Sequence, residues 1–272
     1  MDFLNIDAEG SRCKTVIEYH GISDNFDVEG KTAIITGGTR GIGYATAELF
    51  VRKGVNVVLI GRSAEIVDSA AALGKKACAA RGDIMSKEFI SETMKDALHR
   101  FGSADILVNN AGVVALESAE VMSEETWDMT LDVNLKGVFL MSQAFGAMHI
   151  ENKTPGAIVN IASQAGVIAL DKHAAYSSSK GGMIALTRAL AFEWAKYGIR
   201  VNCVSPTYVT TDSFKKGVDW QGQEGRELLK LLPAGRFAEP AEVAASIVFL
   251  AGDNAAMITG QNLILDGGYT IL

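Results

Sequence analysis

Short apolar runs alternate with longer stretches of helical pattern over most of this 272-residue chain. Apolar runs of strand length occupy residues 32–36, 56–60, 76–80, 106–109, 157–162, 200–204 and 262–265. The stretches between them predict helices at residues 42–53, 64–73, 86–101, 123–149, 174–197 and 240–251. Such alternation is typical of a parallel sheet with helices on both faces. The pattern therefore predicts an α/β fold with one Rossmann-like, doubly wound domain.

Two segments depart from this alternation. Residues 1–29 have no clear period, which predicts an extension that is partly disordered or lies on a neighbouring subunit. Residues 207–232 hold Tyr208 and Trp220 among polar residues and glycines. Aromatic side chains in such a segment either contact a ligand or anchor an ordinary surface helix and loop. The domain itself is thus expected to span residues 30–272.

Composition narrows the classes of protein to which the chain can belong. Its 48% hydrophobic content suits one large domain. No apolar run reaches the roughly 18 to 20 residues that cross a bilayer, and the first residues lack a secretion pattern, so a cytoplasmic protein without a membrane partner is expected. Cys13, Cys78 and Cys203 are widely spaced and form no CxxC pair, which indicates reduced thiols and no metal site. With 25 Lys and Arg against 32 Asp and Glu, a nucleic-acid partner is not expected.

A glycine-rich turn between the first strand and the first helix is the strongest single motif. It reads Thr36-Gly37-Gly38-Thr39-Arg40-Gly41-Ile42-Gly43. One glycine permits a sharp turn, the next lets backbone N–H groups approach a pyrophosphate, and the last lets the helix pack closely on the sheet. The helix directs its unpaired N–H groups and positive dipole end at the anion. We interpret the turn as a nucleotide phosphate site.

A second group of residues points to chemistry at this site. Tyr176 and Lys180 are four residues apart on a predicted helix, so their side chains share one face. Tyrosine, with a pKa of about 10, is a poor base at neutral pH, but a nearby ammonium and an oxidised nicotinamide lower that pKa. Tyr176 could then exchange a proton with an alcohol or carbonyl oxygen. We expect Ser163 to hydrogen-bond the reacting oxygen and Asn134 to hold a water that links Lys180 to solvent.

These motifs together resemble the short-chain dehydrogenase/reductase family. The resemblance rests on the order and spacing of the glycine turn, Asn109-Asn110-Ala111-Gly112, Asn134, Ser163 and Tyr176 to Lys180, and it extends from about residue 30 to the C-terminus. It implies a seven-stranded sheet, a mobile substrate loop at about residues 207–232, and Lys180 on the nicotinamide ribose. The cofactor-binding residues expected from the motifs and the resemblance are Gly37, Thr39, Arg40, Gly41, Ile42, Gly43, Arg62, Asp83, Ile84, Asn110, Ala111, Gly112, Tyr176, Lys180, Pro206, Val209 and Thr211. Asp83 could instead be a turn residue that caps the helix at Ser86.

Cofactor choice is expected to depend on the end of the second strand. A site selective for NAD carries a carboxylate there that binds the adenosine ribose and repels a 2′-phosphate. This chain has Gly61 at that position, followed by Arg62, and a further basic residue, Arg40, inside the glycine turn. Each arginine alone could be a solvated surface charge. Together with the missing acid they predict NADP as the cofactor, with NAD as the alternative.

The substrate class follows from weaker signals. The sequence Ser205-Pro206-Thr207 and the tail from Ile258 to Thr270 resemble family members that act on polyols and ketoses. Gln164 could place an amide near substrate hydroxyls, or could be a loop residue facing solvent. The expected substrate-binding residues are Ser163, Gln164, Tyr176, Tyr208 and Trp220. The leading hypothesis is an NAD(P)-dependent oxidoreductase for a secondary alcohol and ketone of a small polyhydroxylated substrate; a 3-ketoacyl thioester reductase and a non-catalytic NADP-binding sensor are the alternatives.

The helices predicted at residues 123–149 and 174–197 carry apolar residues on more than one face. A single sheet covers only one face of each helix. We therefore predict two-fold interfaces built from these helices, in a homotetramer that the family resemblance also implies.

Overall fold

The computed structural model describes residues 26–271. Its strands form one parallel seven-stranded sheet in the order β3-β2-β1-β4-β5-β6-β7. The strands are β1 (Thr32–Thr36), β2 (Asn56–Gly61), β3 (Ala77–Arg81), β4 (Ile106–Asn109), β5 (Gly156–Ile161), β6 (Ile199–Pro206) and β7 (Asn262–Leu265). The predicted Rossmann-like fold class is confirmed.

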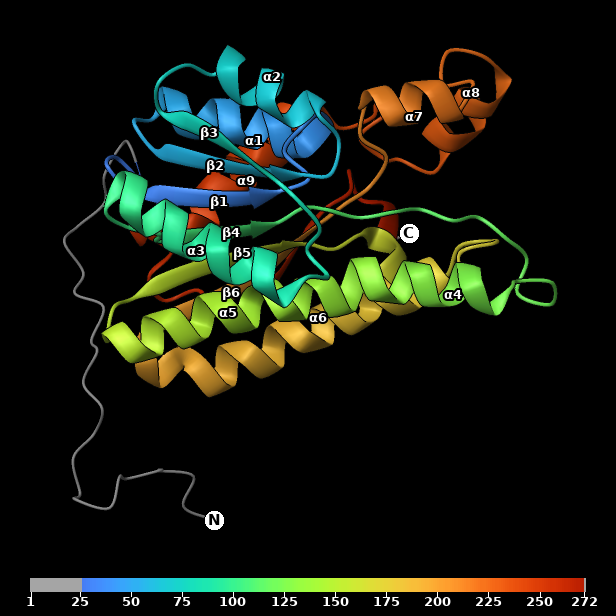
Figure 1. Ribbon diagram of the computed structural model, residues 1–272. Coiled ribbons are helices and arrows are strands. Elements are labelled where there is room, and N and C mark those ends of the chain that lie inside the picture. Colours follow the sequence, from blue (N-terminus) through green and yellow to red (C-terminus); the bar gives the residue numbers. More distant parts are fainter. Residues whose placement is uncertain (1–25, 272) are drawn as a thin grey trace.

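Helices cover both faces of the sheet (Figure 1). They are α1 (Gly41–Arg52), α2 (Glu65–Ala72), α3 (Lys87–Phe101), α4 (Glu124–Leu131), α5 (Gly137–Asn152), α6 (Ala174–Trp194), α7 (Asp212–Gly217), α8 (Gln223–Lys230) and α9 (Pro240–Ala251). One core cluster joins the sheet to α1, α2 and α9, and a second joins it to α3, α5 and α6. Within the described part of the chain, no helix is both long and apolar enough to cross a membrane.

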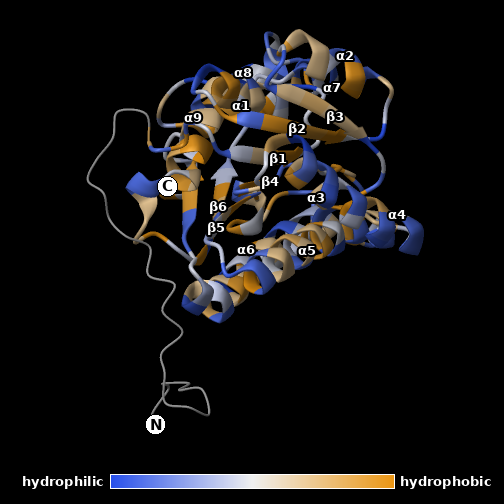
Figure 2. Cartoon of the chain, turned by 60° about the vertical axis from the view of Figure 1, so that its left-hand side comes forward, coloured by the Kyte–Doolittle hydropathy of each residue, from blue (hydrophilic) through white to orange (hydrophobic). Residues whose placement is uncertain are grey.

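The apolar runs that predict strands are buried because helices lie on both sides of them. Every residue of β1, β4 and β6 is buried, and the strands are largely apolar in Figure 2, whereas α4 is mostly hydrophilic. The last strand, β7, differs because it lies at the edge of the sheet, and its Leu263 and Ile264 are 38% and 37% exposed. Edge strands of this kind are surfaces on which further chains can pack.

The helix predicted at residues 123–149 is interrupted. Ser123 caps its start, with Oγ accepting a hydrogen bond from Thr126 N at 3.1 Å, as its position in the sequence predicts. After α4, a π-helical turn occupies Asp132–Lys136, and α5 then continues to Asn152. The sequence pattern did not reveal this turn because one extra residue in a single turn leaves the helical period on either side intact.

Residues 1–29 and residues 207–232 are the two segments that depart from the predicted alternation. Residues 1–25, most of the predicted extension, lie outside the described residues. Phe26 packs edge-on against Phe249 of α9, and Val28 is fully buried, so both residues pack on the domain that is predicted to begin at residue 30. Residues 207–232 contain the short helices α7 and α8.

Candidate active site

The glycine turn lies where the strand order reverses, between β1 and its neighbours β2 and β4. In an open α/β sheet this point forms the ligand crevice. Gly37 and Gly41 have φ values of 66° and 60°, in the left-handed region that glycine adopts without strain. A Cβ atom at Gly43 would lie 2.4 Å from the Gly37 carbonyl oxygen. The start of α1 therefore packs directly on the turn, as the spacing of the three glycines predicts.

Hydrogen bonds join the segment after β4, at Asn110 and Ala111, to the same turn. Thr36 Oγ1 accepts hydrogen bonds from the N–H groups of Asn110 and Ala111 at 3.0 and 2.9 Å. Asn110 Nδ2 donates to the carbonyl oxygens of Thr36 and Gly37 at 3.0 and 2.9 Å. The crevice between β1 and β4 thus has walls of backbone that these hydrogen bonds hold in place.

The start of α1 fits a pyrophosphate. Arg40, its N-cap residue, makes no side-chain capping bond, so its side chain leaves the first-turn N–H groups, which favour an anion, to another partner. Thr211, far along the chain, lies against the turn, since a Cβ atom at Gly41 would be 3.1 Å from Thr211 Cγ2. Ile42 is part of the first turn, and the Thr39 carbonyl oxygen accepts a hydrogen bond from Ser69 Oγ of α2 at 3.1 Å.

Other residues predicted to bind the cofactor lie at neighbouring strand ends. After β3, Asp83 Oδ1 accepts a hydrogen bond from Met85 N at 2.9 Å, which is a local turn contact. Ile84 is 6% exposed and belongs to the core cluster with α3, α5 and α6. Pro206 ends β6, and Val209 pairs with Ala238 in an isolated parallel bridge.

The structure brings Ser163 and Tyr176 together. Ser163 directly follows Ala162, and its Oγ accepts a hydrogen bond from Ala165 N at 3.1 Å, so the hydroxyl proton is free to be donated. Burial raises the pKa of the Tyr176 phenol, and a hydrogen bond from Ser163 acts in the opposite direction. Burial thus has the larger effect on this phenol, and the lowering expected from Lys180 together with an oxidised nicotinamide stays a prediction.

Lys180 is buried below Tyr176 on α6. Its Nζ donates to the Ile161 carbonyl oxygen at 2.6 Å and lies 5.7 Å from the centre of the Tyr176 ring. The side chain is 4% exposed, and burial lowers the pKa of the ammonium from 10.5 to about 8. A lysine with such a pKa can gain or lose a proton near neutral pH.

Asn134 lies in the π-helical turn and is fully buried. Its Oδ1 accepts from Val113 N at 2.8 Å, and its Nδ2 donates to the Val113 carbonyl oxygen at 2.8 Å and to Ser179 Oγ at 3.2 Å. A Cβ atom at Gly112 would lie 3.2 Å from Asn134 Oδ1 and 3.7 Å from Lys180 Nζ. The π-helical turn thus places Asn134 beside the residues that flank Lys180, and such turns are frequent at functional sites.

Sequence reasoning missed two features that support this group. A buried network joins Asn109 Nδ2 to Asn160 Oδ1 at 2.8 Å and Asn160 Nδ2 to Thr187 Oγ1 at 2.9 Å. It connects β4 and β5 to α6 and holds the helix that carries Tyr176. His173, at the start of α6, lies edge-on to the Tyr176 ring with centres 6.0 Å apart. No spacing rule in the sequence marks the network, because it depends on which strands become neighbours, whereas the spacing of three residues between His173 and Tyr176 could have revealed their contact.

The predicted NADP arginines lie on the surface at the other end of the crevice. Arg40 and Arg62 are both exposed, and neither belongs to an ion pair among residues 26–271. A Cβ atom at Gly61 would lie 3.0 Å from Thr39 Oγ1, so the end of β2 touches the glycine turn. A third exposed arginine, Arg81, which the sequence reasoning did not single out, ends β3 beside them.

The predicted substrate residues are only partly brought together. Gln164 follows Ser163 and is 2% exposed. Tyr208 belongs to an aromatic cluster, with ring centres 5.9 Å from Phe214 and 6.5 Å from Tyr269. Trp220 lines a separate cleft beside α8 whose lining residues do not include the catalytic candidates.

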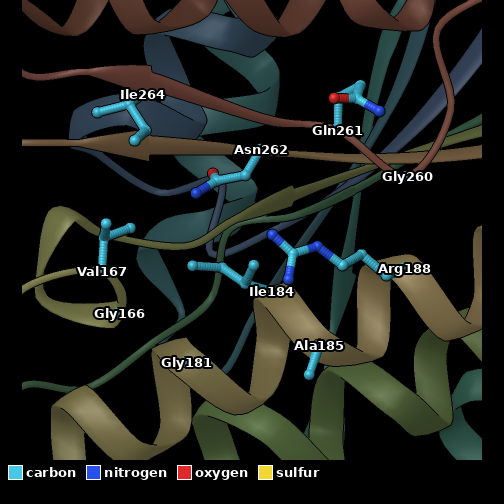
Figure 3. A pocket seen from close by; sticks show the side chains of 10 residues that line it. All are labelled: Gly166, Val167, Gly181, Ile184, Ala185, Arg188, Gly260, Gln261, Asn262 and Ile264. Atoms are coloured by element: carbon cyan, nitrogen blue, oxygen red, sulfur yellow. The ribbon is translucent and has the colours of Figure 1, made fainter.

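A further groove separates α6 from β7. Figure 3 shows Arg188 extending from α6 toward the first residues of β7, with Val167 at the other end of the groove. Its lining residues in the described chain do not include Ser163, Tyr176 or Lys180.

Comparisons with known proteins identify the family of the chain. Residues 37–270 match a family model described as enoyl-(acyl carrier protein) reductase. The chain is 48% identical to the NAD-dependent glycerol dehydrogenase of Listeria innocua, over 93% of this chain and 99% of that protein. It is 46% identical to the D-threitol dehydrogenase of Mycolicibacterium smegmatis, over 91% of this chain and 95% of that protein. The crystal structure of gox2181 superposes with a TM-score of 0.86 at 32% identity, over 91% of this chain and 98% of that chain.

The fold and the crevice define a dinucleotide-binding α/β enzyme. The chain belongs to the short-chain dehydrogenase/reductase family, as its motifs predict. It is an oxidoreductase that interconverts an alcohol and a carbonyl compound with a nicotinamide dinucleotide as cofactor.

Proposed function

We propose that this enzyme oxidises a secondary hydroxyl of a small polyol and reduces the corresponding ketose. The observation that carries this proposal is the position of unpartnered polar atoms. Among the described residues, the buried side-chain atoms without a hydrogen-bond partner include Gln164 Oε1, Ser177 Oγ and Thr207 Oγ1. They directly follow Ser163, Tyr176 and Pro206 in the sequence. Buried polar groups without partners are rare and need an explanation, such as a catalytic role or a bound group, and a substrate with several hydroxyls would supply partners. The similarity to glycerol and D-threitol dehydrogenases supports the same substrate class.

In this mechanism Tyr176 is the general acid and base. Its phenol donates a proton to the carbonyl oxygen during reduction and takes the proton of the hydroxyl during oxidation. Ser163 donates a hydrogen bond to the reacting oxygen when substrate is bound, since Ala165 N occupies only an acceptor position of its Oγ. The nicotinamide, when bound, supplies or accepts the hydride.

Lys180 and Asn134 serve the proton path in this proposal. Lys180 holds the nicotinamide ribose, and its pKa of about 8 lets it pass a proton to or from Tyr176 near neutral pH. Asn134, which already bonds the backbone of Val113 and the Ser179 hydroxyl, keeps this part of the crevice in place and borders the water that reaches Lys180.

We propose NADP as the preferred cofactor. Gly61 leaves no carboxylate for the adenosine ribose, and Arg40 and Arg62 are exposed and outside ion pairs with described residues. Their guanidinium groups are thus available to a 2′-phosphate. The name of the Listeria innocua relative records NAD dependence for that protein, so cofactor choice is the feature in which we expect the two enzymes to differ.

We further propose a homotetramer. Phe192 on α6 is 80% exposed and Phe139 on α5 is 37% exposed, on helices whose other faces already cover the sheet. The edge strand β7 exposes Leu263 and Ile264. Apolar surface on two separate sides of one subunit favours two different two-fold interfaces.

Steady-state assays with both cofactors test the substrate class. We expect kcat/KM for glycerol, threitol and xylitol to exceed that for 2-butanol by at least about tenfold, because a site built to bond hydroxyls rejects analogues that lack them. Activity confined to a 3-ketoacyl thioester would instead support the reductase alternative. Cofactor binding without turnover of any of these compounds would support the non-catalytic sensor.

A further inference from the structure

The last residue of β3 is joined to the end of β2 in a way that the sequence does not reveal. Gly61 and Arg81 are partners in the parallel register of the two strands. Gly82 N donates to the Gly61 carbonyl oxygen at 3.1 Å. Arg81 Nε then donates to the Arg62 carbonyl oxygen at 3.0 Å. The Arg81 side chain therefore holds the backbone of the residue that we assign to the 2′-phosphate.

This hydrogen bond uses only one of the N–H groups of the guanidinium. Arginine carries five donors in a rigid planar fork, so the two terminal amino groups of Arg81 stay available. Arg81 is exposed and is in no ion pair with the described residues. Its charge is thus not neutralised within residues 26–271.

Three exposed arginines lie on neighbouring segments at this edge of the sheet. Arg40 is in the glycine turn, next to Thr39, and a Cβ atom at Gly61 would lie 3.0 Å from Thr39 Oγ1. Arg62 follows Gly61, and Arg81 is hydrogen-bonded to the Arg62 carbonyl oxygen. Like charges placed together repel one another unless an anion lies between them. A phosphate with two negative charges is such an anion, and it accepts paired hydrogen bonds from a guanidinium fork.

We propose that Arg81 is a specificity-determining residue for the 2′-phosphate of NADP. It fixes the loop of Arg62 through Nε and offers its terminal amino groups to the phosphate. A guanidinium that is already anchored to the backbone loses less freedom when it binds. This inference rests on the proposed preference for NADP.

The alternative is that Arg81 only braces the loop. A brace of the adenosine pocket would support NAD and NADP equally, because both nucleotides pass the end of β2. A brace that acts only through Arg62 would affect NADP alone, but it would have no effect once Arg62 is replaced by Ala. A residue that binds the phosphate directly affects NADP alone and does so with or without Arg62.

Isothermal titration calorimetry with 2′,5′-ADP and with 5′-AMP, which lacks only the 2′-phosphate, tests the proposal without any turnover. The variants are Arg81→Met, which removes the charge and the anchor, and Arg81→Lys, which keeps the charge but loses the fork; Arg81→Met is also made in an Arg62→Ala background. Arg52→Met is the matched control, because Arg52 is exposed at the opposite end of α1. AMP binding also reports whether each variant is folded.

We expect the unmodified protein and Arg52→Met to bind 2′,5′-ADP at least about tenfold more tightly than AMP. Arg81→Met should weaken 2′,5′-ADP by about tenfold, also in the Arg62→Ala background, and leave AMP within about twofold, with Arg81→Lys between the two. An effect that disappears in the Arg62→Ala background would show that Arg81 acts only through Arg62. Equal weakening of both nucleotides, or no weakening of 2′,5′-ADP, would overturn the role of Arg81 while leaving the NADP preference intact. If the unmodified protein did not favour 2′,5′-ADP, the NADP preference and this inference would both fall, whereas the polyol dehydrogenase activity would be unaffected.

Discussion

The two ends of the candidate crevice hold their cationic residues in opposite ways. At the catalytic end, Lys180 is 4% exposed, bonded to the Ile161 carbonyl oxygen, and has a pKa of about 8 because of burial. At the adenosine end, Arg40, Arg62 and Arg81 are exposed. A buried charge is costly and is tuned by everything packed around it, whereas an exposed charge interacts weakly until a ligand arrives.

Because the arginines are exposed and Lys180 is buried, substitutions at the two ends of the crevice should affect different properties of the enzyme. A substitution at the adenosine end should alter the choice between two cofactors and little else. A substitution at the catalytic end should change the reaction itself or the stability of the fold. The predictions below test that division, beginning with the largest expected effect.

Replacing Tyr176 by Phe should lower kcat by about 10² to 10⁴-fold, the usual contribution of a general acid and base. The binding of ADP and 2′,5′-ADP should remain unchanged, because only the phenolic oxygen is lost. Steady-state kinetics and calorimetry measure the two effects. Tyr197→Phe, beyond the far end of α6, is the control and should keep full activity; a Tyr176→Phe enzyme with normal kcat would exclude the mechanism.

Lys180 should make stability depend on pH above neutrality. Its pKa is lower in the folded protein, about 8, than the ordinary 10.5, so between these values the unfolded chain binds more protons. The free energy of unfolding should therefore rise with pH from about 8 to 10.5, by on the order of 3 kcal/mol. Below pH 8 the lysine is charged in both states, and this increment is absent.

Urea unfolding at several pH values, with Lys180→Met as the comparison, measures this increment. The variant should lack the rise that Lys180 contributes, although it also loses the hydrogen bond to the Ile161 carbonyl oxygen. Other titrating groups, including Tyr176, are present in both proteins and cancel in the difference. If the free energy of unfolding depended on pH in the same way in both proteins, the folded structure would not lower the pKa of Lys180.

Gly61→Asp should shift the preference from NADP toward NAD by about 10 to 150-fold in kcat/KM, because the carboxylate binds the ribose hydroxyls and repels the 2′-phosphate. Part of the effect is steric, since a Cβ atom at this position would lie 3.0 Å from Thr39 Oγ1 and 3.1 Å from Ile66 Cδ1. Gly61→Ala carries the same Cβ atom without the charge and separates the two contributions.

Arg62→Ala sharpens the same test from the other side. It should weaken NADP by about tenfold and barely affect NAD, because only the phosphate loses a charged partner. If kcat/KM of the unmodified enzyme were tenfold or more higher with NAD than with NADP, neither Arg40 nor Arg62 would bind the 2′-phosphate.

The smallest expected effect on the reaction concerns the assembly. Phe192→Asp on α6 should convert the tetramer to smaller species, because a carboxylate replaces an apolar side chain that is 80% exposed in the subunit. Light scattering at micromolar concentration measures the mass. Val67→Asp on α2, at a residue that is 55% exposed away from α5 and α6, should leave the tetramer intact. A monomeric unmodified protein would contradict the proposal outright.

Local sequence patterns predicted the strands, the main helices and the order of the motifs, because these depend on residues close together in the chain. The glycine turn is recognisable for this reason: Gly37, Gly41 and Gly43 meet requirements of backbone geometry that are local. The π-helical turn at Asn134 was missed, since a single inserted residue is set by packing against Val113 and Ser179 rather than by periodicity.

By itself, then, the sequence determined the fold class, the family and the group of Ser163, Tyr176 and Lys180, all of which leave marks at fixed spacing. Only the tertiary structure decided the sign of the shift in the Tyr176 pKa, because burial depends on what the rest of the chain packs around the phenol. It likewise brought Arg81 to Arg62, nineteen residues apart, since the register of two parallel strands fixes which of their ends meet.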